Sequence, residues 1–405
     1  MRKRLTGLIV LAAAGSTTLA ACSSAGGTGG GSSAGGTIKI GVISDYTGVA
    51  SSSFATNDNG VKAYIKRVNA EGGINGHKLE YVRGDTASSP TGALTAAQKL
   101  VQVDKVFAIV ENSSYFYGAE PFLLKEKVPV VGSGIDGPIW SDPKNTNLFT
   151  ATGVSNSDYS QVAFGQFAKQ VGVTKCGSIA YAGSESAAHA AMGYVQSCQR
   201  AGLQAGYLNT ELPFGTTDVG AIALAIKKSG IDGIYLPLVP STSFALLGAL
   251  KQLGVKLKSA LLPTGYGGDL LANKAGVQAA QGYDFQVVGV PAEAQTAATK
   301  RRAADLAAVG VTTPPTFAEQ ESYLSMVAFG AGLKAAGDKP TPESFLEAMN
   351  NLKNYDGEGL MAPQTISFHE YVPKELCTWF VRLEGETFKI HENMPICGPL
   401  FKLKT

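Results

Sequence analysis

The chain has 405 residues, 16% of them charged, and its formal net charge at pH 7 is +2. This balance does not favour nucleic acid as a partner, because no long basic run occurs beyond the first few residues. About 370 residues follow position 36, which is more than one hydrophobic core normally covers. We therefore expect two lobes.

The first 21 residues have the pattern of a secretory signal. Three basic residues at positions 2–4 precede an apolar segment from Leu8 to Ala14, and small residues follow. The apolar part is too short for a transmembrane helix. Residues 19–22, LAAC, resemble the lipobox of bacterial lipoproteins, which implies a lipid on Cys22 and a mature chain anchored at the extracytoplasmic face of the cell membrane. The alternative is an ordinary cleaved signal that happens to contain a cysteine.

A tether is predicted directly after Cys22. Residues 22–36 are almost wholly Gly, Ser, Ala and Thr after the cysteine, and such a segment cannot pack a core. Its random-coil reach is roughly 20 Å. Removal of residues 1–21 takes away three basic residues and no acidic one, so the formal charge falls from +2 to −1. Since no later apolar run is long enough to span a bilayer, we expect a soluble body held at a membrane surface.

From Thr37 to Val290, short apolar runs alternate with longer amphipathic segments. The predicted strands are 38–43, 79–83, 106–110, 129–131, 178–181, 233–237, 259–262 and 282–288. The predicted helices are 60–70, 92–101, 158–170, 187–201, 218–229 and 243–253. This alternation predicts βαβ units, parallel sheets and helices on both faces of each sheet, which is an α/β fold.

The order of elements changes after Val290. Helices are predicted at 294–309, 317–336 and 342–350, and β segments at 365–368, 378–383 and 388–390. Pro314 and Pro315 separate the first two of these helices, because proline lacks the amide and its ring clashes with the preceding turn.

Four cysteines remain if Cys22 carries a lipid, and an even number in an exported chain predicts disulfides. Four cysteines allow three pairings, which the sequence does not decide. We favour Cys176–Cys198 and Cys377–Cys397, because the members of each pair flank one local unit, a strand with its following helix and a terminal hairpin. No metal site is expected, since there is no Cys-x-x-Cys motif and the histidines are scattered.

Several segments are similar to the type I periplasmic binding proteins of the leucine/isoleucine/valine-binding family. The most specific is VNAEGGING at 68–76, a helix end followed by a glycine-rich turn. Others are KEKVPVVGSG at 125–134, LFTATG at 148–153 and IDGIYLPL at 231–238. The resemblance implies a fold of two doubly wound parallel-sheet lobes, joined by three crossover hinge segments and closing on a ligand between them.

The resemblance also implies how the chain divides between the lobes. The N-terminal lobe would hold residues 37–155 and 286–362, and the C-terminal lobe 156–285 and 363–405. The crossovers would fall near 153–155, 283–285 and 360–362.

In function, the resemblance implies a monomeric receptor that delivers a small organic solute to an ABC importer, that is, to a permease and its ATPase. The alternative is a receptor of the same fold that feeds a signalling partner. We expect neither an enzyme nor a cofactor, because the chain has no G-x-S-x-G elbow, no P-loop and no histidine-rich metal spacing.

The stretch ENSSYFYGAE at 111–120 follows a predicted buried strand. In amino-acid-binding members of the family, the matching loop presents a serine hydroxyl and backbone amides to the ligand carboxylate. Asn112, Ser113, Ser114 and Tyr115 occupy those positions, at the predicted start of a helix, where unpaired N–H groups favour an anion. The alternative for Ser113 is a helix N-cap.

The next loop, residues 132–137, spells G-x-G-x-x-G after a strand. A dinucleotide site would need a helix to open at the third glycine. Pro138 follows that glycine, so we expect a loop and no dinucleotide. The resemblance implies ligand contacts at Gly134, Ile135 and Asp136.

The chain departs from the family at positions that hold the ligand's ammonium group. The matching residues are Ser155 and Thr264, which cannot carry the charge that a buried ammonium needs. Two matching tyrosines are replaced by Ser186 and Val239. These departures favour an uncharged, carboxylate-bearing or aromatic solute over a zwitterion.

Two carboxylates could compensate for these departures. They are Asp136 and Glu319, the second at a predicted helix start, and the alternative for both is a capping or surface role.

Aromatic side chains are available for stacking on a flat ligand. The candidates are Phe54, Tyr115, Tyr117, Trp140 and Tyr266. Successive residues point in different directions, so we expect only part of the run 115–117 to face a ligand.

Overall fold

The first of two main sheets is parallel and five-stranded, in a computed structural model that describes residues 35–152 and 158–404. Its order is β2-β1-β3-β4-β5. The strands are β1 (Thr37–Ser44), β2 (Lys78–Asp85), β3 (Ala108–Asn112), β4 (Val130–Gly132) and β5 (Leu148–Thr150). Strand β3 is displaced by two residues from the prediction, so it runs directly into Ser113.

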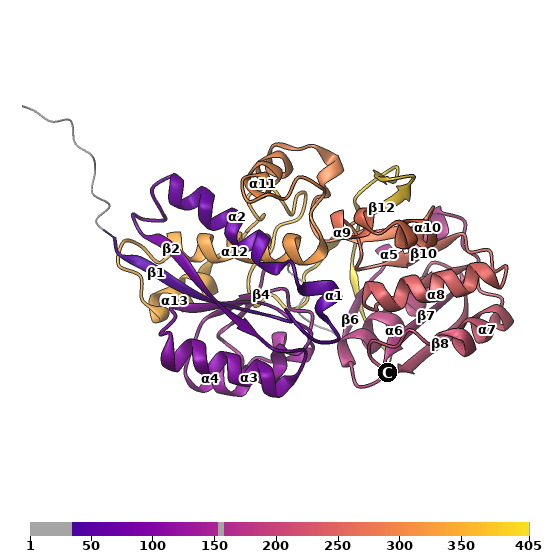
Figure 1. The fold of residues 1–405 in the computed structure, drawn as a ribbon, viewed down its shortest axis with the longest axis horizontal. Coiled ribbons are helices and arrows are strands. Elements are labelled where there is room, and N and C mark those ends of the chain that lie inside the picture. The colour runs from indigo at the N-terminus through magenta and orange to yellow at the C-terminus, as the bar shows by residue number, and fades with distance from the viewer. Residues whose placement is uncertain (1–34, 153–157, 405) are drawn as a thin grey trace, which may run out of the picture. The chain divides into compact units, whose positions relative to one another are not determined.

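Helices cover both faces of this sheet (Figure 1). One face carries α2 (Asn57–Ala70), α11 (Ala297–Ala307), α12 (Phe317–Ala335) and α13 (Pro342–Asn351), and the other α3 (Pro90–Gln98), a π-helical turn (Lys99–Val103) and α4 (Glu120–Lys125). Alternate residues of β1 enter the two cores, Val42 the first and Ile43 the second. The period of two in a strand therefore builds a core on each side.

The second sheet has the order β13-β12-β11-β10-β9-β7-β8, and β14 pairs with β12 outside that path. Its strands are β7 (Lys175–Tyr181), β8 (Gln204–Leu212), β9 (Gly233–Tyr235), β10 (Ser259–Leu262), β11 (Asp284–Val287), β12 (Leu376–Glu384), β13 (Thr387–Ile390) and β14 (Ile396–Gly398). The pairs from β8 to β11 are parallel, and β12, β13 and β14 are added antiparallel.

Two layers of helices also cover the second sheet. One core involves α7 (Gly220–Ser229), α8 (Pro240–Gln252), α9 (Gly268–Ala272) and α10 (Lys274–Ala280), and the other α5 (Ala163–Gln170) and α6 (Glu185–Arg200). The predicted α/β fold with two parallel-sheet lobes is confirmed. No helix in the described ranges combines the length and the apolar character needed to cross a membrane.

Three local predictions need correction. The helix expected from 158 begins only at Ala163, because Tyr159–Gln161 form β6, which pairs antiparallel with β15 (Leu400–Lys402). The strand expected at 365–368 is one isolated bridge from Ile366 to Tyr355. Strand β8 was not predicted, because it lies at a sheet edge and exposes much of its length. A strand whose pairing partner lies far away in the sequence gives no local pattern from which it could be predicted.

The predicted hinge positions can be placed only in part. Residues 153–155 lie outside the described residues. Strand β11 of the second sheet extends to Val287, so the chain leaves that sheet after the predicted 283–285. Phe368 packs in the first core and β12 of the second sheet begins at Leu376, while the crossover near 360–362 stays a prediction.

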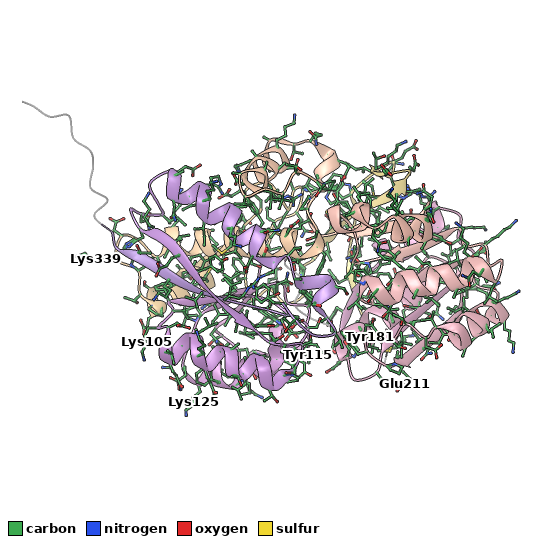
Figure 2. All side chains as sticks on the ribbon, in the orientation of Figure 1. Lys105, Tyr115, Lys125, Tyr181, Glu211 and Lys339 are labelled. Carbon is green, nitrogen blue, oxygen red and sulfur yellow. A yellow bond between two sulfur atoms is a disulfide. The ribbon has the colours of Figure 1, made fainter. Side chains whose placement is uncertain are left out.

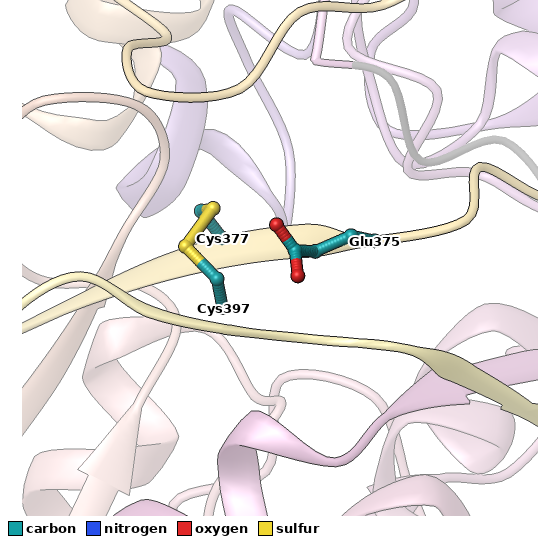
Figure 3. Close-up of side chains that lie close together, drawn as sticks. All are labelled: Glu375, Cys377 and Cys397. Carbon is teal, nitrogen blue, oxygen red and sulfur yellow. A yellow bond between two sulfur atoms is a disulfide. The ribbon is translucent and has the colours of Figure 1, made fainter.

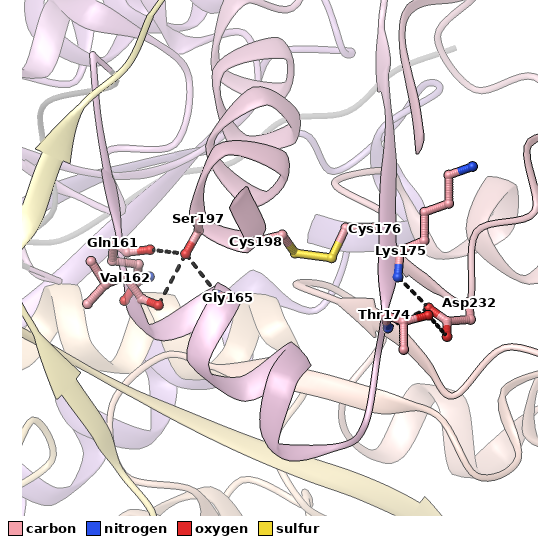
Figure 4. Close-up of a disulfide and its surroundings, with 9 residues drawn as sticks. All are labelled: Gln161, Val162, Gly165, Thr174, Lys175, Cys176, Ser197, Cys198 and Asp232. Carbon is pink, nitrogen blue, oxygen red and sulfur yellow. Dashed lines mark hydrogen bonds between the residues drawn. A yellow bond between two sulfur atoms is a disulfide. The ribbon is translucent and has the colours of Figure 1, made fainter. Parts of the chain in front are cut away.

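Both predicted disulfides are confirmed. Cys176 of β7 is bonded to Cys198 near the end of α6 (Figure 4). Beside it, Ser197 Oγ donates to the carbonyl oxygen of Gln161 at 2.8 Å and accepts from the N–H of Gly165 at 2.8 Å. The two contacts join α6 to the start of α5.

The second disulfide, Cys377–Cys397, joins residues that are direct partners in the β12–β14 ladder (Figure 3). It closes the terminal hairpin, as expected.

The glycine-rich turn at 72–76 is also confirmed as a left-handed helix end. Gly73 has φ +91°, and a Cβ there would lie 2.1 Å from the carbonyl oxygen of His77. Only glycine fits both the dihedral and the close approach.

Candidate ligand-binding cavity

A cavity of about 340 Å³ lies at the carboxyl ends of strands from both sheets, within the compact unit formed by residues 34–405. The loops that follow β3, β4, β7, β9, β10 and β11 reach it through Ser114, Ile135, Ser184, Val239, Thr264 and Val288. This edge is where open α/β sheets bind ligands. The volume suits a small molecule.

Aromatic rings form much of the cavity wall. They are Phe54, Tyr159, Phe164, Tyr181, Phe214, Tyr235 and Phe317. The rings of Phe54 and Phe317 meet edge to face with centroids 5.9 Å apart, and those of Tyr181 and Phe214 lie 4.3 Å apart. Such walls suit a ligand with an apolar or flat body.

Three glutamines supply polar groups to the same wall. The side-chain oxygen of Gln286 accepts from the Tyr235 hydroxyl at 3.2 Å, and that of Gln364 accepts from the Cys377 N–H at 2.8 Å. Gln161 accepts from the Thr378 hydroxyl. Within the described ranges, none of the three amide nitrogens has a protein partner, so each can donate to a ligand.

Glu321 is the acidic residue of the cavity wall. It lies on α12, its side chain is 1% exposed, and its Oε2 has no hydrogen-bond partner in the described part of the chain. Burial raises the pKa of this carboxyl to about 8. No described lysine or arginine lines the cavity. A buried acid without a partner is costly in free energy unless it is protonated or meets a ligand group.

The loop at 111–118 directs most of its donors toward the protein rather than the cavity. Ser113 Oγ donates to Asp45 Oδ1 at 2.6 Å, and the Ser114 N–H donates to Asp45 Oδ2 at 2.8 Å. The Asn112 amide donates to Asn57 Oδ1 at 3.0 Å. Only Ser114 of the four predicted contacts in this loop lines the cavity.

The helix expected after Ser113 is a 3₁₀ turn, η2 (Phe116–Gly118), which precedes α4. Ser113 Oγ accepts from the N–H of Tyr115 at 3.0 Å, so it stabilises the turn without acting as an α-helix N-cap. Phe116 is buried in the core, while Tyr117 is 40% exposed. Tyr115 and Tyr181, both labelled in Figure 2, each contact Phe214, with ring centroids 5.7 Å and 4.3 Å from its ring, and Tyr115 itself does not line the cavity.

Buried carboxyl groups gather beneath this loop. Glu111 Oε2 accepts from the Ser113 N–H at 3.1 Å, and Oε1 accepts from the Gly134 N–H at 3.4 Å. Burial, together with the nearby Asp136, raises the pKa of Glu111 well above its usual range. Burial also raises the pKa of Asp136 to about 7, although the Trp140 ring N–H donates to it at 2.5 Å. We call Asp45, Glu111 and Asp136 the buried acid cluster.

Other predicted contacts do line the cavity. They are Phe54, Gly134, Ile135, Ser186, Val239 and Thr264. Ser186 Oγ donates to the carbonyl oxygen of Ile135, and Thr264 Oγ1 donates to that of Leu238 at 2.7 Å. Both hydroxyls therefore give their proton to the backbone and can only accept from a ligand.

The remaining predicted residues lie elsewhere. Asp136 does not reach the lining, and Tyr266 donates its hydroxyl to Glu293 Oε2 at 2.7 Å. Glu319 forms a capping box with Thr316 at the start of α12, and Trp140 is buried in the core. Ser155 lies outside the described residues.

One group of possible metal ligands is found in the described ranges, formed by Glu375, Cys377 and Cys397 (Figure 3). Both sulfurs belong to the disulfide, so neither can act as a thiolate ligand. This group is therefore no metal site.

The sequence model of the family described as "Periplasmic binding protein" matches residues 37–387. The chain belongs to this family. An "Amino acid binding protein" from Pseudomonas aeruginosa is 24% identical over 221 residues, which cover 54% of this chain and 58% of the relative. The first curated relatives are thus matched over 58% to 65% of their own length.

Solved structures show the same fold at low identity. A Rhodopseudomonas palustris (R. palustris) solute binding protein in complex with 4-hydroxybenzoate has a TM-score of 0.68 at 21% identity, covering 91% of this chain and 98% of that one. The substrate binding protein LivJ from Streptococcus pneumoniae, in complex with isoleucine, has a TM-score of 0.70 at 18% identity, covering 89% and 99%. At these identities the likeness establishes the fold alone.

Sequence reasoning missed Glu321, the three glutamines and most of the wall aromatics. Glu321 lies in the polar run 319–322 at the start of the predicted helix 317–336, where acidic residues are ordinary and gave no signal of a site. Gln161 lies where the predicted helix proved to be strand β6. Their approach to the cavity depends on contacts between distant segments, which no local pattern encodes.

Proposed function

We propose that this chain is the solute-binding receptor of an ABC importer and captures a small organic solute between its two lobes. The solute class is amino-acid-like, carboxylate-bearing or aromatic. The observation that carries the proposal is the cavity itself, which draws its wall from the carboxyl-end loops of both sheets. A ligand there contacts both lobes at once and favours their closure.

The membership of the periplasmic binding protein family supports this function. So do the names of relatives, which include an amino acid binding protein and solute binding proteins of ABC transporters. The permease and ATPase are the partners that the proposal requires, and the receptor acts as a monomer.

The proposal includes an extracytoplasmic location with a lipid anchor on Cys22. The LAAC motif, the apolar segment before it and the Gly/Ser-rich residues after it support this location. We expect labelled palmitate to enter the protein in the native cell, and a Cys22→Ala variant to lose the label and leave the membrane fraction. Unchanged labelling in that variant would remove Cys22 as the lipid site.

A thermal-shift screen tests solute binding directly. The purified protein is heated with amino acids, aromatic acids, amides and sugars, each at millimolar concentration. A ligand at 100 times its dissociation constant adds about 2.7 kcal/mol of stability, a shift of several degrees. No stabilisation by any class would contradict the proposed function.

Uptake measurements separate transport from sensing. Deletion of the gene should abolish uptake of the solute that the screen identifies, and reintroduction should restore it. If uptake persists and only a transcriptional response to the solute is lost, the chain is a signalling receptor of the same fold.

A further inference from the structure

Glu321 is the one carboxyl group of the described cavity wall, and its carboxyl group forms no hydrogen bond or ion pair within the described part of the chain. Its side chain is buried and lines the cavity, and its Oε2 has no hydrogen-bond partner in the described ranges. No described cation forms an ion pair with it, although α12 packs against several elements that carry charges.

We propose that Glu321 receives a positively charged nitrogen of the solute, and that the receptor therefore selects ligands with an ammonium group. This inference rests on the proposed function. The negative charge that Ser155 and Thr264 cannot provide would then come from Glu321 on helix α12 of the N-terminal lobe. The ammonium would pair with the Glu321 carboxylate and satisfy its buried oxygen.

The other wall residues favour a cation at this point over an anion. No lysine or arginine of the described chain lines the cavity, and the hydroxyl of Ser113 and the N–H of Ser114 are already bonded to Asp45. The faces of the aromatic rings carry negative potential, which attracts cations within about 6 Å. A carboxylate at the same place would meet neither a formal positive charge nor a free donor from that loop.

The glutamine amides then serve the rest of the solute. Gln161, Gln286 and Gln364 each use the side-chain oxygen within the protein and keep the amide nitrogen available. These donors suit a carbonyl or carboxylate oxygen. A solute that fits this cavity has an ammonium group for Glu321, an acceptor oxygen for the glutamine amides and an apolar body for the aromatic wall. An amino-acid-like solute has all three.

Other ionisable groups share the cavity lining with Glu321 or lie on elements that pack against its helix. Tyr159, Tyr181, His189 and Tyr235 share the cavity lining with Glu321. The elements packed against α12 bring Glu111 on β3, Asp58 and Arg67 on α2, and Glu347 on α13. None of these forms an ion pair with Glu321, and burial alone raises its pKa to about 8.

The expected pH dependence follows from proton release. Below pH 8 the empty site holds a protonated Glu321, which must lose its proton to pair with an ammonium group. Affinity for an amine should therefore rise by up to about tenfold per pH unit from pH 6 to pH 8 and then level off. A ligand that accepts a hydrogen bond from the protonated acid would show the opposite trend, losing affinity above pH 8.

Calorimetric titration with matched probes tests the proposal. The probes are 2-phenylethylamine, 2-phenylethanol and 3-phenylpropanoate, with leucine and phenylalanine as zwitterions. The wild-type protein should prefer the amine or the zwitterions over the alcohol by at least tenfold at pH 8. Glu321→Gln should reduce that preference to threefold or less and abolish the pH dependence.

Glu319→Gln is the matched control, two residues away on the same helix and outside the lining, and it should keep the wild-type preference. An unchanged preference or pH dependence in Glu321→Gln would overturn the proposal, and a surviving pH dependence would point to His189. Binding of the alcohol or the acid without the amine would also overturn it, while leaving the proposed function standing. Failure of every probe and of the wider screen would count against both.

Discussion

The buried acid cluster and Glu321 are two of the places where the N-terminal lobe buries carboxyl groups, and their hydrogen bonds differ. In the buried acid cluster, Asp45 accepts from Ser113 and Ser114, and Glu111 accepts from backbone amides of neighbouring loops. Among the described residues, Asp136 Oδ2 and Glu321 Oε2 both lack a hydrogen-bond partner, but of these two residues only Glu321 lines the cavity. The cluster holds its own loops in place, whereas Glu321 faces a cavity.

Asp45 and Glu111 therefore stabilise the fold, whereas the Glu321 carboxyl group is available to a ligand. Donors directed at Glu111 and Asp45 are already satisfied, so a ligand would gain little from them. The unused oxygen of Glu321 leaves a free-energy cost that a ligand can remove. The loop at 111–118, which the sequence indicated most strongly, therefore has a mainly structural role. Glu321 on α12, which the sequence did not indicate, is the better candidate for ligand contact.

The largest expected effect concerns stability and pH at Glu321. The folded chain keeps this group protonated up to about pH 8, while the unfolded chain ionises it near the ordinary value of 4.5. The folded state thus binds more protons in that window, and its free energy of unfolding falls as pH rises. Relative to Glu321→Gln, the wild type should lose up to about 4 kcal/mol between pH 5 and pH 8.

Urea denaturation of both proteins at several pH values measures this difference. If the difference in the free energy of unfolding between the wild type and Glu321→Gln stayed constant from pH 5 to pH 8, Glu321 would not be protonated in the folded state. The contrast with the buried acid cluster would then disappear.

The second prediction removes the main acceptor of the cluster. Asp45→Ala leaves the donors of Ser113, Ser114 and Thr86 without their acceptor. Buried unsatisfied donors cost about 1–3 kcal/mol each, so we expect a loss of about 3 kcal/mol in the free energy of unfolding. Asp45→Asn keeps one acceptor oxygen and should lose less. Equal denaturation midpoints for the alanine variant and the wild type would show that the cluster does not support the loop.

The third prediction separates loop support from ligand contact. Ser113→Ala removes a donor to Asp45 and an acceptor for the Tyr115 N–H, and should lower stability by about 2 kcal/mol. The affinity for whichever probe binds should change less than twofold, because the hydroxyl does not line the cavity. A tenfold loss of affinity with normal stability would return Ser113 to the binding site.

The smallest effect is expected at Glu319. Its carboxylate accepts from the Thr316 N–H at 2.8 Å and from the Asn59 amide at 2.7 Å. Glu319→Gln keeps only one acceptor oxygen for these two donors, so it should cost about 1 kcal/mol and leave ligand affinity unchanged. If calorimetry instead gave equal losses of affinity at positions 319 and 321, the distinction between cap and cavity wall would be wrong.

How much of the site could be predicted varies with the kind of contact. Gly134, Ile135, Ser186, Val239 and Thr264 were found from the resemblance, since they follow predicted strands at the edge where such sheets bind ligands. Asn112, Ser113 and Tyr115 belong to the right loop, but their side chains turn away. The sequence places these residues on the loop, but the direction of their side chains depends on partners such as Asp45, which follows a different strand, β1.

By itself, the sequence determined the class of fold, the left-handed glycine turn and the strand ends that line the cavity, and it favoured the disulfide pairings that the structure confirms. These features follow from periodicity, local geometry and family segments within short stretches of chain. Only the tertiary structure decided that the donors of 113–114 are bonded to Asp45 and that Glu321 faces the cavity with no partner for its Oε2 among the described residues. Hydrogen-bond satisfaction is a property of groups brought together from distant segments, and it depends on the packing that joins them.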